Sequence, residues 1–555
     1  MKKFFSEILL CVCMAVALIT GCGKKEAIPL FIDGEANFII VRSADADNET
    51  INAAADLRQT IADNLGITVN HKPDSIAHKD GQLEVNIGIT NRPDSQAVYG
   101  EVSNETETNG LDYIIKQKGD YIYIIGMSNR ALQEAVDYFA EEFCSDAGGS
   151  VQKDYHYVYT YTGEEEKAFS INGDTDLAKY KIVTPKYNMS YLVGREVETL
   201  NDSLLVSNGV LLGQATDWDE EREYEIIIDQ TERPGTPKTE DSDQYRIKVE
   251  GNKVYITGGS NEATAVAVKE FNKMVTEGGS VDEKTDITGS YAETVKDYED
   301  YYAMTFHDEF DTMDRSIWHF YTGTNTMLSE SDCNTDDPKN QWIEDGKLYM
   351  KTTKEGDHTN SVHVRTDNST WFRYGLIEAS VKMRQTSGQG GAFWLLGNTS
   401  QDYYAEIDIY EATMNAVKFT PLSWVSKSIS GVNSGPYYCD FKGDVKTYEG
   451  GVAGDTYYRF ENDDKEQYFH TYGIEWTDSY ITGFIDGRTF IRIDTTFDER
   501  AVKTFNNFMQ IIISQGALDS GGATKVNETT DWENNYSIFD YIRLYQTSNG
   551  EIRNR

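Results

Sequence analysis

Ala405-Glu406-Ile407-Asp408-Ile409-Tyr410-Glu411 is the stretch that decides the fold of the second half of this 555-residue chain. Its polar and apolar residues alternate, which predicts a β-strand with Glu406 and Asp408 on one face. Glu411 lies five positions beyond Glu406, so a regular strand would turn its side chain to the opposite face. One β-bulge between Asp408 and Glu411 would restore the alternation and place all three carboxyl groups on the same face.

Three carboxyl groups on one strand face repel one another when they are ionised. Like charges raise one another's pKa, so one carboxyl group keeps its proton near neutral pH while another stays ionised. Glycoside hydrolysis needs this asymmetry, because one carboxylate attacks the sugar and one carboxylic acid protonates the leaving oxygen. Taken alone, Glu-x-Asp-x-x-Glu also fits a solvated strand face, since acidic residues are common in this chain.

Short alternating segments continue on both sides of this strand and are separated by Gly, Asn and Asp. They include residues 347–351, 375–383, 472–476 and 507–514. Such segments are typical of antiparallel sheets packed face to face. The sequence therefore predicts an all-β sandwich or jelly roll over residues 302–548.

Further motifs surround the acidic strand. They are Phe306-His307-Asp308-Glu309-Phe310, Tyr374-Gly375-Leu376-Ile377-Glu378-Ala379, Gly391-Ala392-Phe393-Trp394-Leu395-Leu396-Gly397, residues 469–477, Phe484-Ile485-Asp486-Gly487 and residues 540–545. In this order and spacing, the set resembles glycoside hydrolase family 16 over residues 302–547. The resemblance implies a concanavalin-like jelly roll that hydrolyses internal β-linkages of a polysaccharide with retention of configuration.

The same resemblance implies a role for each acidic residue. Glu406 would be the nucleophile and Glu411 the general acid/base, while Asp408 between them would orient Glu406 and hold the shared proton. The extra residue in the motif is typical of laminarinase-like and agarase-like members. A β-1,3- or mixed-linkage glucan is therefore the expected substrate, with a β-galactan next. Gly390-Gly391 stands where laminarinases usually carry Trp-Pro, which affects the substrate more than the mechanism.

Aromatic and histidine side chains are the candidates for sugar contacts. Trp394, Trp371 and Trp424 could stack on the apolar face of a pyranose, and His470 and His363 could hydrogen-bond its hydroxyl groups. Core packing is the alternative for each of them. No cofactor is expected to be required. Glu309 and Asp540 are either ligands of a structural calcium ion, as in some relatives, or satisfied surface acids.

The first half of the chain contains an internal duplication. Tyr113 and Gly126 recur as Tyr245 and Gly258, each 132 residues later. Each copy predicts a strand, a helix, several strands and a closing amphipathic helix after Ser-Asn, which is an α+β domain. We expect one domain over residues 31–165, a second over 166–280 and a linker over 281–301.

Both copies resemble the accessory domain that precedes the catalytic domain in β-hexosaminidases and α-glucuronidases. Neither copy contains an acid pair, a His cluster or a phosphate-binding loop. We expect them to be non-catalytic, either spacers or glycan contacts.

The N-terminus predicts secretion. Residues 1–21 carry two lysines and a short apolar run, which is typical of a signal peptide. Leu18-Ile19-Thr20-Gly21-Cys22 resembles the lipobox of bacterial lipoproteins, which implies acylation of Cys22, a tether over residues 22–30 and an extracytoplasmic, membrane-anchored protein. Cys333 and Cys439 either form a disulfide or are inert thiols, and no zinc motif is present in the sequence.

Charge limits the kinds of partner. The chain has 51 Lys and Arg against 92 Asp and Glu, a net charge of −41, so nucleic acid would be repelled. No protein partner can be inferred. Two functions follow from the sequence: a lipid-anchored endo-β-glycosidase acting on a polysaccharide, or a cell-surface glycan-binding lipoprotein that has lost turnover.

Overall fold

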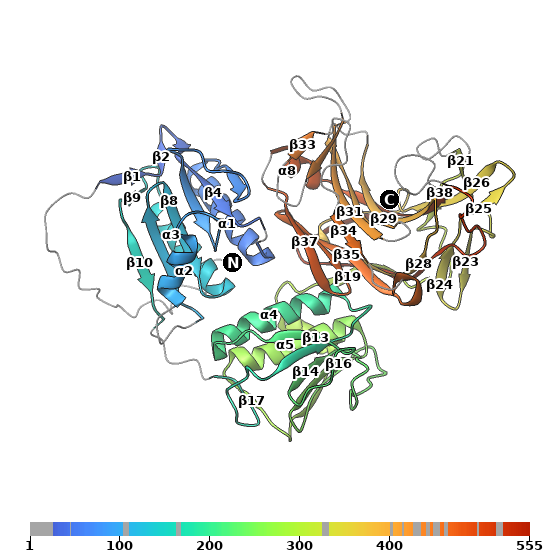
Figure 1. Cartoon of the computed structure of the whole chain (residues 1–555), viewed down its shortest axis with the longest axis horizontal. Helices are drawn as coiled ribbons and strands as arrows, with labels where there is room; N and C mark the ends of the chain where they lie inside the picture. The colour runs from blue at the N-terminus through green and yellow to red at the C-terminus, as the bar shows by residue number, and fades with distance from the viewer. Residues whose placement is uncertain are drawn as a thin grey trace.

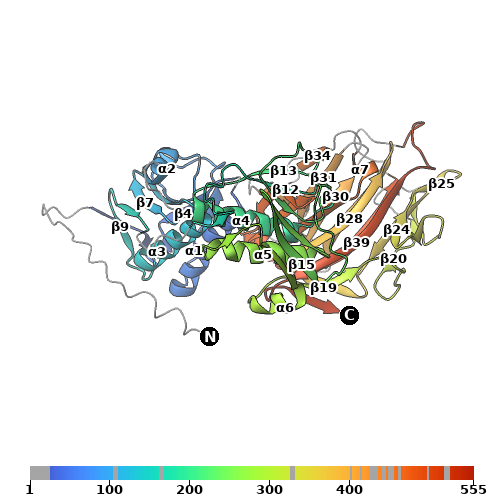
Figure 2. The same cartoon turned by 90° about the horizontal axis from the view of Figure 1, so that it is seen from below.

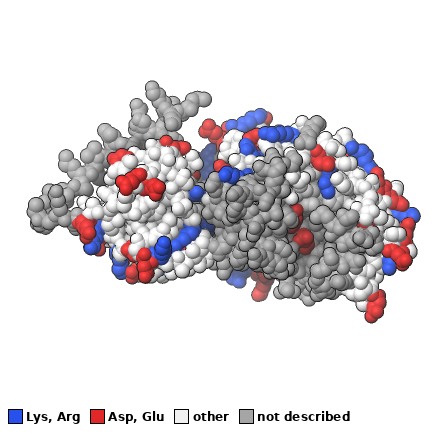
Figure 3. All heavy atoms as spheres, turned by 90° about the horizontal axis from the view of Figure 1, so that it is seen from above, with Lys and Arg blue, Asp and Glu red and all other residues white. Residues whose placement is uncertain are grey.

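The structure is a computed structural model. It describes the backbone of residues 26–44, 46–103, 110–161, 168–324, 332–399, 403–412, 416–425, 435–439, 445–447, 456–459, 464–496, 499–517 and 526–554. Three units follow one another along the chain, coloured blue, green and yellow to red in Figure 1. Within the described residues, no helix has the length and apolar character needed to cross a membrane. Acidic and basic side chains are interspersed over the face seen in Figure 3.

The first unit is a six-stranded sheet with helices packed on it. Its main elements are β4 (Phe38–Arg42), α1 (Asn48–Leu65), β5 (His71–Pro73), β6 (Leu83–Ile87), α2 (Ser95–Ser103), β7 (Tyr113–Lys118), β8 (Tyr121–Gly126), α3 (Asn129–Phe143) and β10 (His156–Tyr159). The strand order is β10-β7-β8-β6-β4-β5. Small pairings of β1 (Ala27–Pro29) with β9 (Ser150–Gln152) and β2 (Phe31–Ile32) with β3 (Glu35–Ala36) flank the sheet. Apolar residues of α1 and α3, such as Leu57 and Phe139, are buried in its core.

The second unit repeats this arrangement. Its main elements are β12 (Lys181–Thr184), α4 (Tyr191–Asn208), β13 (Gly213–Thr216), β14 (Glu225–Ile228), β15 (Gln244–Glu250), β16 (Lys253–Gly258), α5 (Asn261–Thr276) and β18 (Asp286–Ser290). The order β13-β12-β14-β16-β15-β18 matches that of the first sheet strand for strand, with β12, β13, β14 and β16 parallel and β15 and β18 antiparallel to their neighbours. The two sheets therefore have one topology, as two copies of one unit would.

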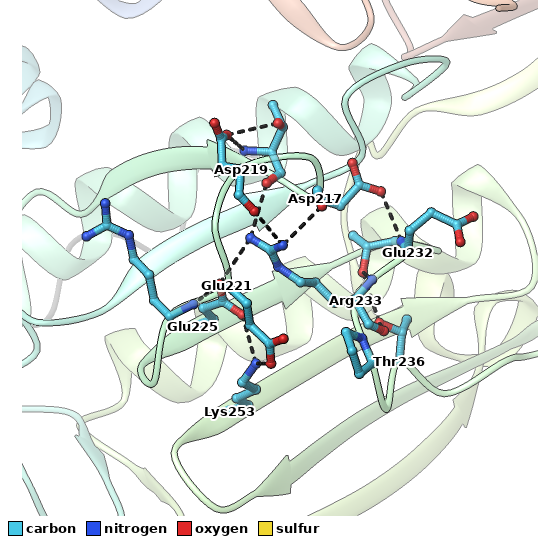
Figure 4. A network of polar contacts seen from close by, with 12 residues as sticks. Asp217, Asp219, Glu221, Glu225, Glu232, Arg233, Thr236 and Lys253 are labelled. Atoms are coloured by element: carbon cyan, nitrogen blue, oxygen red, sulfur yellow. Dashed lines mark hydrogen bonds and ion pairs between the residues drawn. The ribbon is translucent and has the colours of Figure 1, made fainter.

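A buried arginine–glutamate pair also occurs in both units. Arg92 Nε lies 2.6 Å from Glu84, and Arg233 Nη2 lies 3.2 Å from Glu225. Each guanidinium also donates to backbone carbonyls of the loop after the second strand, namely Asp74 and Ile76 in one copy and Asp217 and Asp219 in the other. Figure 4 shows this network in the second unit. Because both charges are buried, the pair holds the two loops together and leaves neither charge without a partner.

Gly-x-Ser-Asn, the motif shared by the two copies, is explained by how each closing helix starts. Ser128 and Ser260 cap α3 and α5. Each side chain accepts a hydrogen bond from the backbone nitrogen three residues later in the chain. A Cβ atom at Gly126 would lie 2.2 Å from the Leu132 nitrogen, and the same position at Gly258 is as crowded. Glycine is required there because the helix begins directly against the strand that precedes it.

The predicted linker over residues 281–301 was wrong in part. Residues 286–290 form β18, the edge strand that pairs with β15. Arg246 on β15 makes two 2.6 Å bonds to Asp286 on β18, a cross-strand ion pair in a segment with weak apolar alternation. The helix α6 (Tyr291–Thr294) and a 3₁₀ turn (Val295–Asp297) follow.

The third unit is a sandwich of two sheets, as expected for a jelly roll. The smaller, eight-stranded sheet contains β19 (Ala303–Asp308), β23 (Gln341–Glu344), β24 (Lys347–Met350), β28 (Gly375–Arg384), β35 (His470–Trp476), β36 (Tyr480–Ile485), β37 (Arg488–Asp494) and β39 (Tyr536–Gln546). The main path of the larger, 14-stranded sheet runs through β26 (His358–Arg365), β38 (Met509–Ala517), β29 (Gln389–Gly397), β30 (Tyr403–Ala412) and β31 (Ala416–Val425). The shorter strands of this sheet include β20 (His319–Phe320), β22 (Asp332–Asn334), β27 (Thr370–Arg373) and β40 (Glu551–Asn554). The described strand pairs of the third unit are antiparallel apart from that of β22 with β26. One apolar core, which includes Trp318 and Trp476, lies between the sheets.

The second unit packs on the outer face of the eight-stranded sheet. Its core is continuous with Leu376, Phe484 and Tyr545 of the third unit. The buried carboxylate of Glu378 on β28 accepts bonds from Ser190 Oγ at 3.0 Å and from the Tyr191 backbone nitrogen at 3.1 Å, at the start of α4. Figures 1 and 2 show α4 and α5 beside the sandwich. Apolar burial and the hydrogen bonds of Glu378 thus fix the second unit on the third.

One carboxylate connects all three units. Glu475 on β35 is 1% exposed. It accepts hydrogen bonds from Asn48 of the first unit at 3.2 Å and from Tyr302 at 2.7 Å. Arg195 of the second unit lies 3.2 Å from the same carboxylate. Removing either the charge or its donors would leave buried polar groups unsatisfied where the three units meet.

Gly194→Ala tests how tightly α4 is packed. In an exposed helix interior this change stabilises by about 1 kcal/mol. A Cβ atom at Gly194 would, however, lie 2.0 Å from the Gly487 carbonyl oxygen. We expect a loss of about 1–3 kcal/mol in the free energy of unfolding, measured by urea denaturation. Thr199→Ala, on an exposed position of α4, should change it by less than ~0.5 kcal/mol. A more stable Gly194→Ala protein would contradict the close contact.

Glu378 predicts a pH dependence of stability. Burial raises the pKa of Glu378 from 4.5 to about 7, although the Ser190 hydrogen bond opposes the shift. Between these values the folded protein holds a proton that the unfolded chain has released, so stability falls as the pH rises from about 4.5 to about 7. We expect Glu378→Gln to flatten this decline by up to about 3 kcal/mol, measured by urea denaturation across that range. An unchanged slope would show that Glu378 titrates normally.

Candidate active site

The acidic strand β30 contains an irregularity at the predicted place. Asp408 pairs with Thr420 and Glu411 with Lys418, so the register on β31 advances two residues while β30 advances three. On the other side, Trp394 pairs with Asp408 and Phe393 with Tyr410, which leaves Ile409 as the extra residue. An additional residue on one strand of an antiparallel pair is a β-bulge.

The bulge divides the side chains of β30 between two faces. Its apolar residues Ala405, Ile407, Ile409, Tyr410 and Ala412 all belong to the sandwich core. Ile409 and Tyr410 are adjacent yet both buried, which only the extra residue permits. Glu406 and Glu411 are partly exposed, and Asp408 is 6% exposed. The three carboxyl groups therefore lie on the side of the sheet away from the core, which we call the acidic face.

Trp394 lies beside the acids on this face. It pairs with Asp408 across β29 and β30, and side chains of paired residues point to the same side of a sheet. Its neighbours Phe393 and Leu395 are core residues, whereas Trp394 is partly exposed. The structure thus brings the first of the predicted sugar-contacting residues next to the acidic triad.

His363 extends the acidic face toward β26. Its ring centroid is 5.8 Å from that of Trp394, at an interplanar angle of 84°. Arg365 donates from Nε to His363 Nε2 over 2.7 Å. Burial, together with the positive charge of Arg365, lowers the pKa of His363 to about 3. His363 is therefore a neutral imidazole in the physiological range, and its Nε2 atom acts as an acceptor.

Arg365 and Tyr321 complete this cluster, and sequence reasoning missed both. The Arg365 guanidinium lies 4.0 Å from the centroid of the Tyr321 ring. The Tyr321 backbone nitrogen donates to the His363 carbonyl oxygen at 2.9 Å, and its side chain is 41% exposed. Arg365 could have been found from the sequence, since it lies two residues from His363 on one strand and so shares its face.

Tyr404 is a further residue of the acidic face that the sequence did not single out. It lies two residues before Glu406 on β30, and its side chain is partly exposed. Burial, and then the negative charge of Glu406, raise the pKa of Tyr404. Tyr404 therefore keeps its phenolic proton near neutral pH and stays a hydrogen-bond donor near Glu406.

The other predicted sugar contacts have different outcomes. Trp371 on β27 lies in the row of Gln510, Leu396 and Glu406, but only 8% of its surface is exposed. Its indole donates to the Asp367 carbonyl oxygen at 2.9 Å, so little of the ring is available for stacking. The backbone of Trp424, on β31, pairs with that of Tyr404 on β30. The side chain of Trp424 lies outside the described residues.

For His470 the structure supports the alternative of core packing and not a contact with the substrate. It lies on β35 of the eight-stranded sheet, not on the sheet that carries the acids. Its side chain is 1% exposed, its Nδ1 atom lies 2.6 Å from Asp486, and its ring meets Tyr187 of the second unit at 4.9 Å. His470 is therefore part of the contact between two units. The sequence could not distinguish which sheet its strand would join.

Glu309 and Asp540 do not fit a calcium site. Glu309 receives two hydrogen bonds from the Arg543 guanidinium, at 2.9 and 2.8 Å. Asp540 is ion-paired with Lys347. Calcium needs several oxygen ligands that are not already neutralised by a cation. Among the residues that the structure describes, no group of three or more His, Cys, Asp or Glu could hold a metal ion.

Gly391 has a packing role. A Cβ atom there would lie 2.6 Å from Ser537 Oγ and 2.8 Å from Gln515 Oε1. The alternation of β29 turns Gly391 toward the core and Gly390 toward the acidic face. Of the two glycines, only Gly390 thus lies on the acidic face.

The cysteine predictions concern a disulfide and a lipid anchor. Cys333 is a free thiol, so it forms no disulfide with Cys439. The lipidation candidate Cys22 and the signal segment lie outside the described residues.

The chain is similar to parts of two curated proteins. The chain is 22% identical over 260 residues to the clotting factor G alpha subunit of Tachypleus tridentatus, covering 45% of this chain and 35% of that protein. It is 25% identical over 232 residues to the kappa-carrageenase of Pseudoalteromonas carrageenovora, covering 38% of this chain and 53% of that protein. The chain thus spans about a third to a half of the length of these curated relatives.

Solved structures and a family match complete the comparison. A laminarinase from Flavobacterium sp. UMI-01 is 24% identical, with a TM-score of 0.35, over 44% of this chain and 100% of that one. Residues 328–536 match the family described as Glycosyl hydrolases family 16.

Proposed function

We propose that this protein is a retaining endo-β-glycosidase that hydrolyses internal linkages of a polysaccharide. The observation that carries the proposal is the bulge at Ile409, because it keeps Glu406, Asp408 and Glu411 on one face of β30. The family match over residues 328–536 supports the same reaction class. Three carboxyl groups on the solvent side of one strand can supply the nucleophile and the proton donor that glycoside hydrolysis needs.

Each acid has a proposed role. Glu406 attacks the anomeric carbon, and Glu411, protonated at first, gives its proton to the leaving oxygen. The glycosyl–enzyme ester is then hydrolysed by water that Glu411 deprotonates, which restores both groups. Asp408, 6% exposed between them, orients Glu406 and shares the proton. Trp394, partly exposed beside Asp408, offers a ring face on which a sugar stacks.

A β-1,3- or mixed-linkage glucan is the proposed substrate, with a β-galactan second. Similarity to a laminarinase supports the glucan, and similarity to a kappa-carrageenase keeps the galactan. We further propose that Cys22 carries a lipid anchor and that the protein acts outside the cytoplasm. The two N-terminal units would then connect the anchor to the catalytic unit.

Glu406→Gln and Glu411→Gln test the catalytic assignment. Laminarin, lichenan, agarose, porphyran and mucin glycans are incubated with each protein, and new reducing ends are measured. We expect the wild type to release oligosaccharides from at least one of them. Each variant should lose about 10³-fold or more in rate, because the amide neither attacks nor transfers the proton.

Glu355→Gln is the matched control for these variants. Glu355 lies on the same unit in β25 (Thr353–Glu355), is exposed and is 3.5 Å from Lys339. Its replacement changes the charge equally and should leave the rate unchanged. Wild-type binding to a glycan without any release across the panel would contradict the proposal and support the glycan-binding lipoprotein.

A further inference from the structure

Arg365 differs from most arginines of the described chain because it makes no ion pair with a described carboxylate. The negative charge of Asp367 acts on it, but that carboxylate lies 3.0 Å from His319 Nδ1. Arg315 pairs with Asp336 at 2.7 Å, and Arg543 pairs with Glu309 at 2.8 Å. Arg365 instead contacts two uncharged groups, the His363 Nε2 atom and the Tyr321 ring. In a chain of net charge −41, a half-buried guanidinium without a carboxylate partner among the described residues is a costly arrangement unless it has a ligand.

Its surroundings hold Arg365 in one orientation. His363 accepts the Nε proton at 2.7 Å, and Tyr321 covers one face of the guanidinium at 4.0 Å. Both contacts leave the two terminal amino groups without a hydrogen bond to any described residue. A planar fork fixed along one edge and one face presents its remaining donors in a set direction, as recognition of a carboxylate or a sulfate group requires.

Arg365 lies on the acidic face, in register with the acids. It pairs with Ile512 of β38, which pairs with Trp394, which pairs with Asp408. Three strand spacings of ~4.8 Å place its Cα atom about 14 Å from that of Asp408. Arg365 thus lies along the same row as the acids, where it meets a sugar ring at some distance from the bond that is broken.

We propose that Arg365, supported by Tyr321 and His363, binds an anionic substituent of the glycan, a sulfate ester or a carboxylate. The glycan bound on the acidic face then carries charged substituents, which favours a substituted β-galactan or glucan over the unsubstituted glucan that was placed first above. This inference rests on the proposed function for the statement that the bound glycan is a substrate. Binding of the charged group by Arg365 does not depend on hydrolysis. Three carboxyl groups on the same face would repel such a chain, so a local cation is needed to hold it.

The test measures binding with the Glu406→Gln protein, so that turnover plays no part. Affinity electrophoresis compares a sulfated galactan with its desulfated form, and a uronate-containing glucan with its carboxyl-reduced form. We expect at least one charged glycan to bind about tenfold or more tightly than its neutral partner. The pair that shows the difference identifies sulfate or carboxylate. The preference should weaken as salt is raised.

Arg365→Gln in the Glu406→Gln background should abolish the preference for the charged glycan without weakening the binding of the neutral one. Arg365→Lys should retain part of it, because the charge remains while the planar fork is lost. Arg315→Gln is the matched control, since Arg315 also lies over a ring, that of Phe320 at 3.9 Å, but is ion-paired. It should leave the preference intact.

Two outcomes separate this inference from the proposed function. Equal binding of charged and neutral glycans, or a preference that survives Arg365→Gln, would overturn the role of Arg365 even if the enzyme is active. An Arg365-dependent preference in a wild-type protein that releases nothing would uphold the binding site and refute the hydrolase. Thermal unfolding of each variant checks that the fold is retained.

Discussion

A single extra residue in β30 is the constraint on which the proposed function depends. Tyr410, on the core side of the bulge, packs 5.0 Å from the Tyr472 ring and 6.3 Å from the Phe393 ring. Ile409 beside it is also buried. Two adjacent apolar side chains are thus held in the core, and the strand has to present Glu411 on the same face as Glu406. Apolar packing on one side of the sheet therefore sets the geometry of the charges on the other.

The bulge and the sandwich could be predicted because both follow from the period of a strand. The spacing from Glu406 to Glu411 is incompatible with a regular strand if all three acids share a face. His470 shows where this reasoning stops, since alternation fixes the face of a strand but not the sheet that it joins. The edge strand at Asp286 forms by pairing with β15, about 40 residues earlier in the chain, which no local pattern predicts. Arg365 could have been predicted, because it lies two residues from His363 in the sequence and so shares its face of the strand.

The two N-terminal units are built into the same particle as the sandwich. Glu378 caps α4 across one boundary, and Glu475 gathers donors from all three units. Buried carboxylates make such boundaries specific, because each is costly without its partners. The units pack on the eight-stranded sheet, whereas the acids lie on the 14-stranded one. Attachment and the proposed chemistry thus use opposite sheets of the sandwich.

Covalent trapping of the glycosyl–enzyme intermediate tests the central claim most directly. A 2-deoxy-2-fluoro glycoside with a good leaving group, built on the sugar of the polysaccharide that is cleaved, slows the second step more than the first. Peptide mass spectrometry then locates the attached sugar. The account predicts that it is esterified to Glu406. A label on Glu411 or Asp408, or inhibition without any ester on β30, would contradict it.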